Sequence, residues 1–236
     1  MKIIILTRDK IQLFLYLLGI ILCLFILFPY FSNTKYTKGS LNRITLLVDP
    51  GHGGVDGGTA DHLGNLEKDI NLAIALKLRA QLRQSGLNVF MSRETDTELS
   101  PFIKGRQGRH RRDLSARIEK AKTTGSLFII SIHCDWSTDR GRHGMIAFYN
   151  YQDPAGKKLA LIVQEEFNKI QKTPQKAAPG NYFIIKQPGV SGVLLEVGFL
   201  SNPEEAVLLQ NKEYQEKIAL AIANGILQYC RNLSST

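Results

Sequence analysis

Short apolar runs alternate with longer helical patterns from residue 44 onward, and this alternation constrains the fold more than any other feature of the sequence. Strands are predicted at 44–48, 88–92, 127–133, 145–149, 182–186 and 193–197. Helices are predicted at 67–82, 114–121, 157–170, 204–209 and 214–229. Strands that alternate with long helices imply crossover connections and parallel pairing. The sequence therefore predicts a single α/β domain with a mostly parallel, roughly six-stranded sheet covered by helices on both faces.

The segment that precedes this domain is apolar enough to cross a membrane. No charged residue occurs from position 11 to 34, and about twenty apolar residues span the roughly 30 Å of a hydrocarbon layer as a helix. Lys2, Arg8 and Lys10 precede the run and favour a cytoplasmic N-terminus. A cleaved signal peptide is the alternative, but the run is longer than a usual h-region and no small-residue cleavage motif follows it.

We therefore predict a single-pass membrane protein whose folded domain lies on the extracytoplasmic side. The predicted divisions are a cytoplasmic tail at 1–10, a transmembrane signal anchor at 11–30, a linker at 31–43, the folded domain at 44–230 and a tail at 231–236.

The composition is that of a folded protein with an anionic partner. Hydrophobic residues make up 44% of the chain and charged residues 22%, which excludes a disordered protein. The net charge of +9 favours an anionic surface, either phospholipid or a wall polymer, and no nucleic-acid module is present. The three cysteines lie far apart, so neither a disulfide framework nor a cysteine metal knuckle is supported.

Polar residues with metal-binding chemistry follow the predicted strands where these end. His52 lies in a glycine-rich turn after the first strand, Glu67 begins the next helix, and His133 ends a strand. Ligands gather beyond the carboxyl ends of parallel strands. Two histidines and one glutamate match a catalytic zinc site, which leaves the fourth position open. Glu196 lies in an apolar strand, where a buried carboxylate needs either a salt-bridge partner or a function.

Four motifs in chain order resemble the zinc-dependent N-acetylmuramoyl-L-alanine amidases: DPGHGGVDGG, LEKDINLAIA, ISIHCD and LLEVGFLSNPEEA. The resemblance implies that His52, Glu67 and His133 hold one Zn²⁺ per chain and that Glu196 is the catalytic carboxylate. It also implies hydrolysis of the amide between N-acetylmuramic acid and the L-alanine of peptidoglycan. A zinc ion would lower the pKa of its water toward about 7, and Glu196 would carry the proton to the leaving amine.

Within that family, the lone N-terminal anchor and the stretch IKGRQGRHRRDLSARIEKA are similar to the germination-specific amidases of spore formers. That similarity implies a substrate in spore cortex peptidoglycan, a product on the way to muramic lactam, and a location in the forespore intermembrane space. Two other functions stay open: a zinc peptidase that cuts within peptide stems, and a non-catalytic wall-binding scaffold.

Three neighbours of the metal ligands are candidates for a supporting role. Asp135 shares a strand face with His133 and is either a ligand or, as we prefer, a group that orients one. Asn71 lies one turn after Glu67, and Asp49 could orient His52 through its other ring nitrogen.

A basic run follows later in the chain, with the residues Lys104, Arg106, Arg109, His110, Arg111 and Arg112. Glycines interrupt the run, so we predict a loop. It is either solvated surface or a docking site for wall carboxylates or for a protein partner.

Overall fold

The computed structural model describes Arg8, Gln12, residues 16–18, 41–100, 108–187 and 189–233. By its internal contacts the chain divides into two units, Met1–Thr37 and Lys38–Thr236. The second unit contains the whole sheet and both hydrophobic clusters described below, so it has the core it needs to fold on its own.

The second unit is built on one six-stranded sheet with the order β2-β1-β3-β6-β4-β5. The strands are β1 (Thr45–Pro50), β2 (Asn88–Met91), β3 (Phe128–Asp135), β4 (Ile146–Tyr149), β5 (Ala178–Pro179) and β6 (Ser191–Phe199). The four strands β2, β1, β3 and β6 are parallel to one another, and β4 runs antiparallel to β6. The predicted mostly parallel α/β sheet is confirmed.

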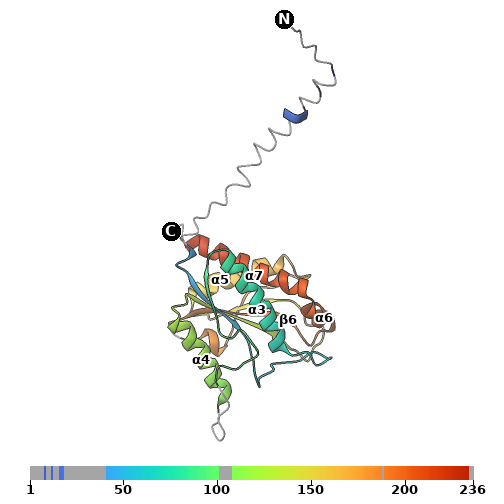
Figure 1. Ribbon diagram of the computed structural model, residues 1–236. Helices are drawn as coiled ribbons and strands as arrows, with labels where there is room; N and C mark the ends of the chain where they lie inside the picture. The colour runs from blue at the N-terminus through green and yellow to red at the C-terminus, as the bar shows by residue number, and fades with distance from the viewer. Residues whose placement is uncertain are drawn as a thin grey trace. The chain divides into compact units, whose positions relative to one another are not determined.

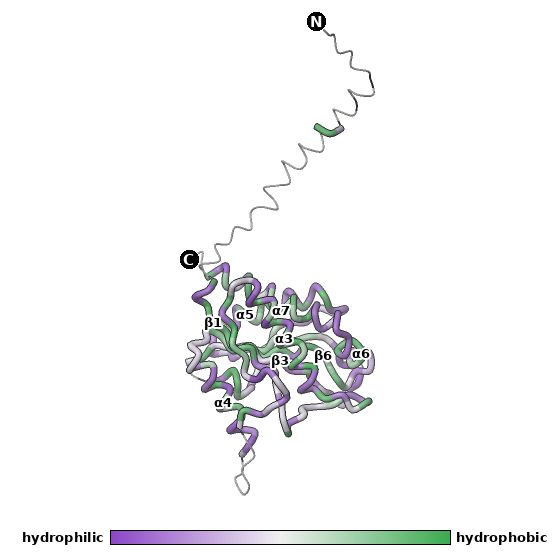
Figure 2. The backbone as a smooth tube through the Cα atoms, viewed as in Figure 1, coloured by the Kyte–Doolittle hydropathy of each residue, from purple (hydrophilic) through white to green (hydrophobic). Residues whose placement is uncertain are grey.

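Helices cover both faces of this sheet (Figure 1). The described part of this unit contains the helices α3 (Glu67–Gln84), α4 (Arg109–Thr123), α5 (Pro154–Asn168), α6 (Pro203–Gln210) and α7 (Lys212–Leu233) and the 3-10 turn η1 (Phe183–Ile185). The larger hydrophobic cluster contains the inner faces of α3, α5 and α7, and the smaller one contains those of α4 and η1. In Figure 2 the hydrophobic backbone positions concentrate at the centre of this unit, where the strands lie.

Alternate residues of the central strands supply the two clusters. On β1, Leu46 and Val48 belong to the larger cluster, whereas Leu47 between them belongs to the smaller one. All three are fully buried. A strand apolar on both faces is expected where helices cover both, and this explains why the strands appear in the sequence as continuous apolar runs.

Two predicted elements differ from the structure. The strand predicted at 182–186 is the 3-10 turn η1, and the edge strand β5 lies earlier, at Ala178–Pro179. The helix predicted from residue 114 begins at Arg109, so the predicted basic loop is wrong for Arg109–Arg112. Arginine has a high helix propensity. Gly108, with φ 77°, adopts a left-handed conformation that lets the chain turn directly into the helix. Lys104 and Arg106 lie outside the described residues.

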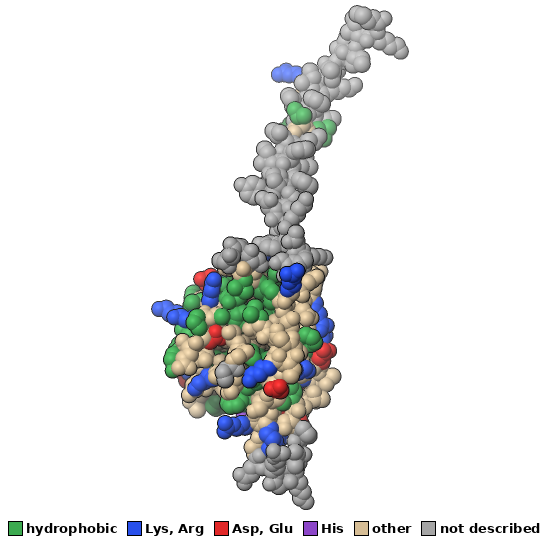
Figure 3. Space-filling model, turned by 90° about the vertical axis from the view of Figure 1, so that its left-hand side faces the viewer, with side chains coloured by type: hydrophobic (Ala, Val, Ile, Leu, Met, Phe, Trp, Pro, Cys, Tyr) green, Lys and Arg blue, Asp and Glu red, His purple; other side chains and the backbone are tan. Residues whose placement is uncertain are grey.

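The predicted membrane anchor at 11–30 lies outside the described residues except for Gln12 and residues 16–18. Among the residues that the structure describes, no helix combines the length and the apolar character that a membrane span requires. One face of the molecule is drawn in Figure 3, where Lys and Arg side chains are spread around an area of hydrophobic surface.

Candidate metal centre

The turn after β1 presents His52 in an unusual backbone conformation. His52 has φ 61°, and no other residue except glycine has a positive φ in the described part of the chain. Such a conformation costs free energy and persists only where the surroundings enforce it. Gly51 beside it has no side chain, and a Cβ there would lie 2.2 Å from Cε1 of His133. The glycine therefore lets the two histidine rings approach.

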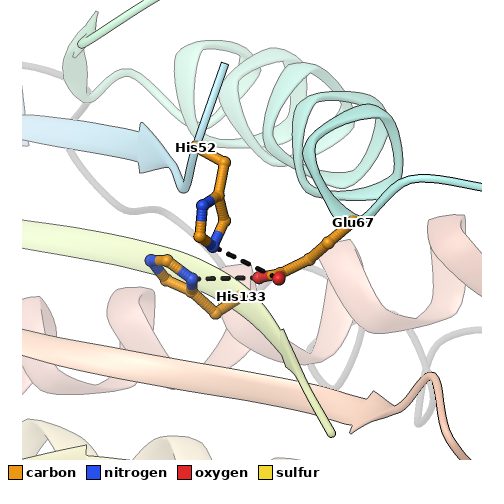
Figure 4. Close-up of side chains that lie close together, drawn as sticks. All are labelled: His52, Glu67 and His133. Atoms are coloured by element: carbon orange, nitrogen blue, oxygen red, sulfur yellow. Dashed lines mark hydrogen bonds and ion pairs between the residues drawn. The ribbon is translucent and has the colours of Figure 1, made fainter. Parts of the chain in front are cut away.

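His52, Glu67 and His133 meet at the carboxyl edge of the sheet (Figure 4). Their ligand atoms all lie within 4.8 Å of one another. Nε2 of His52 lies 3.2 Å from Oε2 of Glu67, and Nδ1 of His133 lies 3.0 Å from Oε1 of the same carboxylate. The structure thus brings together the three residues that the sequence predicted as ligands, from a turn, a helix start and a strand end.

Glu67 is held in place by donors other than the histidines. The backbone N–H of Thr59 and its hydroxyl donate to Oε2 at 2.9 and 3.1 Å. Asn71 Nδ2 and the backbone N–H of Cys134 donate to Oε1, each at 3.1 Å. The structure thus places Asn71, which the sequence suggested as a neighbour of the site, in contact with a candidate ligand. Four donors fix both carboxylate oxygens toward the histidines.

Asp56, which the sequence analysis missed, orients His52. Its Oδ1 accepts a hydrogen bond from Nδ1 of His52 at 2.9 Å, which turns Nε2 toward Glu67. The expectation that Asp49 has this role is wrong. Asp49 is buried beneath the turn, where its oxygens accept hydrogen bonds from Ser92, Ser131 and Arg117. The missed signal is the second aspartate of DPGHGGVDGG, placed four residues after the histidine.

Hydrogen bonds within the candidate site shift the pKa values of His52 and Glu67 in opposite directions. Burial alone lowers the pKa of His52, but its hydrogen bonds to Asp56 and Glu67 raise it to about 9. Burial alone raises the pKa of Glu67, but the hydrogen bonds from His133 and His52 lower it far below its ordinary value. A histidine must lose its proton to bind a metal ion, so the raised pKa of His52 makes cation binding depend on pH.

Glu196 lies on the strand next to His133 and is paired with it in register. Its side chain is buried, and its Oε2 has no hydrogen-bond partner among the described residues. Burial raises the pKa of Glu196 well above the usual range, and the nearby Asp135 and Glu67 raise it further. The salt-bridge alternative for Glu196 therefore finds no partner among the described residues.

Asp135 is not one of the three clustered ligands. The register between β3 and β6 shifts between His133 and Asp135, so the regular alternation that placed both on one face is interrupted there. Oδ1 of Asp135 accepts a hydrogen bond from the backbone N–H of Trp136 at 2.7 Å. Its effect on the site in this structure is electrostatic, through Glu196.

Arg117, which the sequence analysis also did not identify, is buried and stabilises the turn that contains His52. The guanidinium of Arg117 donates to the carbonyl oxygens of Pro50 and His52 at 2.9 and 2.7 Å. It also pairs with Asp49 and Asp113, each at 2.7 Å. Only 2% of the Arg117 side chain is exposed. The sequence showed no sign of this role because Arg117 follows a basic run that resembles solvated surface.

A parallel sheet with an open His–Glu–His donor set at its carboxyl edge defines an α/β enzyme class with a candidate metal centre. The model of the N-acetylmuramoyl-L-alanine amidase family matches residues 46–228. The chain belongs to this family, and it is an N-acetylmuramoyl-L-alanine amidase that acts on peptidoglycan. The resemblance carried by the four motifs is thereby confirmed.

Relatives with similar sequences and structures are named as amidases. The germination-specific N-acetylmuramoyl-L-alanine amidase of Bacillus subtilis (strain 168) is 36% identical over 229 residues, 94% of this chain and 96% of that protein. The CwlD amidase from Clostridioides difficile, solved in complex with the GerS lipoprotein, is 34% identical with a TM-score of 0.77, covering 82% of this chain and 100% of that one. The catalytic domain of CwlV from Bacillus (Paenibacillus) polymyxa var. colistinus is 31% identical with a TM-score of 0.69, and the match covers 79% of this chain and 97% of that one.

Proposed function

We propose that His52, Glu67 and His133 hold a zinc ion that the amidase reaction requires. The observation that carries the proposal is the convergence of three ligand atoms within 4.8 Å beside a buried oxygen of Glu196 that has no hydrogen-bond partner in the described part of the chain. Imidazole nitrogen and carboxylate oxygen are zinc ligands, and three of them leave a coordination position open. When bound, zinc would supply a Lewis acid that polarises the amide carbonyl and makes water more acidic.

Glu196 is the proposed proton carrier. Its buried position beside His133 places a carboxyl group next to the ligand cluster. Burial strengthens its affinity for a proton, and a cation at the ligand cluster would weaken it again. A carboxyl group whose pKa is raised by burial and lowered by a nearby cation can take a proton from the attacking water and deliver it to the leaving amine.

Digestion of peptidoglycan by the Lys38–Thr236 unit tests the activity and its metal together. We expect free stem peptides that begin with alanine, identified by mass spectrometry, and no such products after treatment with a chelator. Added Zn²⁺ should restore them. Cleavage within the stem would support a zinc peptidase instead. Undiminished activity after verified removal of the metal would contradict the zinc requirement.

Removal of the Asp56 carboxylate should weaken the metal site. Asp56→Asn keeps the shape of the side chain but removes the charge that faces Nδ1 of His52 at 2.9 Å. Loss of such an orienting group costs about 10- to 100-fold in metal affinity. The affinity is measured by competition with a zinc chelator.

Asp139→Asn is the matched control for this substitution, since Asp139 is exposed and caps a loop through the N–H of Gly141. Its zinc affinity should equal that of the unaltered protein. Equal affinities for all three proteins would rule out the orienting role of Asp56.

We further propose that the substrate is spore cortex peptidoglycan and that the reaction leads toward muramic lactam. The support is the similarity over 94% of the chain to an amidase named as germination-specific. Deletion of the gene in the host should then leave cortex without muramic lactam, as measured in digested cortex by mass spectrometry. A normal muramic lactam content would contradict this role.

The proposed location is the outer side of a membrane, with the anchor at 11–30, the linker at 31–43 and the catalytic domain at 44–230. Its support is the uncharged apolar run of the sequence. We also propose a protein activator, because the similar C. difficile amidase was solved with a lipoprotein.

A further inference from the structure

The loops at the amino ends of the parallel strands form an edge opposite the candidate metal centre. We call it the amino edge, and it comprises residues 41–45, 83–88, 120–128, 149–158, 183–187, 189–191 and 229–233. Contacts join these segments. Asp153 accepts a hydrogen bond from the Ser191 hydroxyl at 3.0 Å, and the rings of Phe128 and Tyr229 meet at 5.1 Å. In Figure 1 the last turns of α7 lie beside the start of the domain.

Charge on the amino edge is almost entirely positive. Seven exposed basic residues lie there: Arg43, Arg83, Lys122, Lys157, Lys158, Lys186 and Arg231. Asp153 is the one acidic residue among the described residues of these segments. Its carboxylate is already engaged, since it caps α5 through the N–H of Gly156 and accepts from Ser191 and Gly192. An anionic surface that approached this edge would therefore meet no exposed repulsive charge from these segments.

Helix dipoles explain only part of this charge. Helices α3, α4 and α7 end at the amino edge, and basic residues in a last turn stabilise a helix. Helix α5 begins there instead, so Lys157 and Lys158 lie near the end where the dipole disfavours cations. Their ammonium groups lie 5.9 and 5.8 Å from the rings of Tyr149 and Tyr229. Local helix stability does not account for this pair.

Exposed apolar side chains lie among these cations. Leu127 is 42% exposed, Tyr151 71% and Leu233 42%, and all three belong to the amino edge. A hollow of about 920 Å³ also opens there, with Lys122 and Lys186 in its lining. Cations interleaved with exposed leucine and tyrosine match an anionic lipid surface, which offers both phosphate groups and an apolar layer. A wall polymer would match the charge but not the apolar side chains.

We propose that the amino edge binds the surface of an anionic lipid bilayer. The chain enters the domain at this edge, since β1 begins at Thr45, and the proposed linker at 31–43 could extend at most about 45 Å. The metal centre follows the other end of β1, about 20 Å further along the strand at roughly 3.3 Å per residue. Docked in this way, the domain directs its catalytic site away from the membrane and toward the wall. The proposal does not depend on the zinc site, and the exposed cations and apolar side chains of the amino edge support it without the anchor.

Vesicle binding of the Lys38–Thr236 unit tests this proposal without the apolar segment. The probes are vesicles of phosphatidylcholine alone and vesicles with equal parts of phosphatidylcholine and phosphatidylglycerol, separated by sedimentation. We expect binding to the anionic vesicles that weakens as salt is added. Lys157→Gln with Lys158→Gln should lower the partition coefficient by at least about tenfold, because each cation at an anionic surface contributes roughly fivefold.

The matched control is Lys169→Gln with Lys172→Gln, which removes the same charge at the opposite end of α5, where both lysines are exposed and paired with glutamates. It should bind anionic vesicles within about twofold of the unaltered unit. Both double variants should retain amidase activity on peptidoglycan fragments, which verifies their folding. Equal losses in the two variants, binding to teichoic acid but not to vesicles, or no preference for the anionic vesicles would each overturn the proposal.

Discussion

Glu196→Gln is expected to reduce amidase turnover by about 10²- to 10⁴-fold while zinc binding is retained. Glutamine has nearly the same shape as glutamate but cannot carry the proton from water to the leaving amine. Glu196 is also not among the three clustered ligands, so its replacement leaves the donor set intact. Turnover is measured by the release of stem peptides, and zinc content by elemental analysis of the purified variant. A variant that turns over at nearly the normal rate would show that another group carries the proton.

Thermal unfolding separates this catalytic role from a structural one. The buried Oε2 of Glu196 has no partner among the described residues, and its environment disfavours the ionised form. A neutral amide in its place should leave the unfolding temperature of the metal-free protein unchanged or higher. The matched control is Glu166→Gln, since Glu166 is likewise buried but lies on α5 and pairs with Lys169. This control should retain normal turnover.

The sequence predicted the sheet well because its central strands are apolar on both faces. Such runs are recognisable without knowledge of their partners, as in Thr45–Pro50 and Ser191–Phe199. The prediction failed at the sheet margin. Residues 182–186 are apolar enough for a strand, but they form a 3-10 turn packed on the smaller cluster. Tertiary packing decides between the two conformations for so short a run.

The residues of the candidate site likewise fall into those that the sequence predicted and those that it did not. His52, Glu67 and His133 were recognisable because each stands at an element boundary with suitable chemistry. Arg117 was not recognisable, because its role depends on contacts that span the fold, whereas Asp56 was missed although it lies only four residues after His52. Arg117 reaches the carbonyl oxygen of His52 from 65 positions away in the chain. The spacing of apolar residues predicts helices and strands, but it does not predict a side-chain contact between such distant residues.

Arg117→Met is expected to destabilise the folded unit by about 3–5 kcal/mol, because it leaves the buried carboxylate of Asp49 without its cation. At about 2–4 °C per kcal/mol for a domain of this size, the unfolding temperature should fall by roughly 10 °C. The His52 carbonyl also loses its donor, so zinc affinity should fall. Calorimetry measures the first effect and chelator competition the second.

The matched control is Arg79→Met. Arg79 pairs with Glu94 at 2.6 Å, but more than half of the Glu94 side chain is exposed, and a pair of that kind contributes at most about 1 kcal/mol. A fall in unfolding temperature as large as that of Arg117→Met would show that the loss of any ion-paired arginine has this effect. It would remove the argument for a special role of the buried network beneath His52.

The pH dependence of the Arg117→Met deficit identifies its cause. Burial raises the pKa of Asp49, but Arg117 and the hydroxyls of Ser92 and Ser131 hold it below its ordinary value of 3.8. Ionised Asp49 therefore stabilises the unaltered protein above about pH 4, and this contribution is lost as the pH falls through the folded-state pKa. Without Arg117, the effect of burial on the pKa of Asp49 is no longer offset by a nearby positive charge, so this pKa rises. Ionisation of Asp49 then opposes folding at neutral pH. The stability difference between the two proteins should then be largest near pH 7 and shrink steadily toward acid. A deficit that does not change with pH would assign the loss to packing around Arg117 and not to its charge.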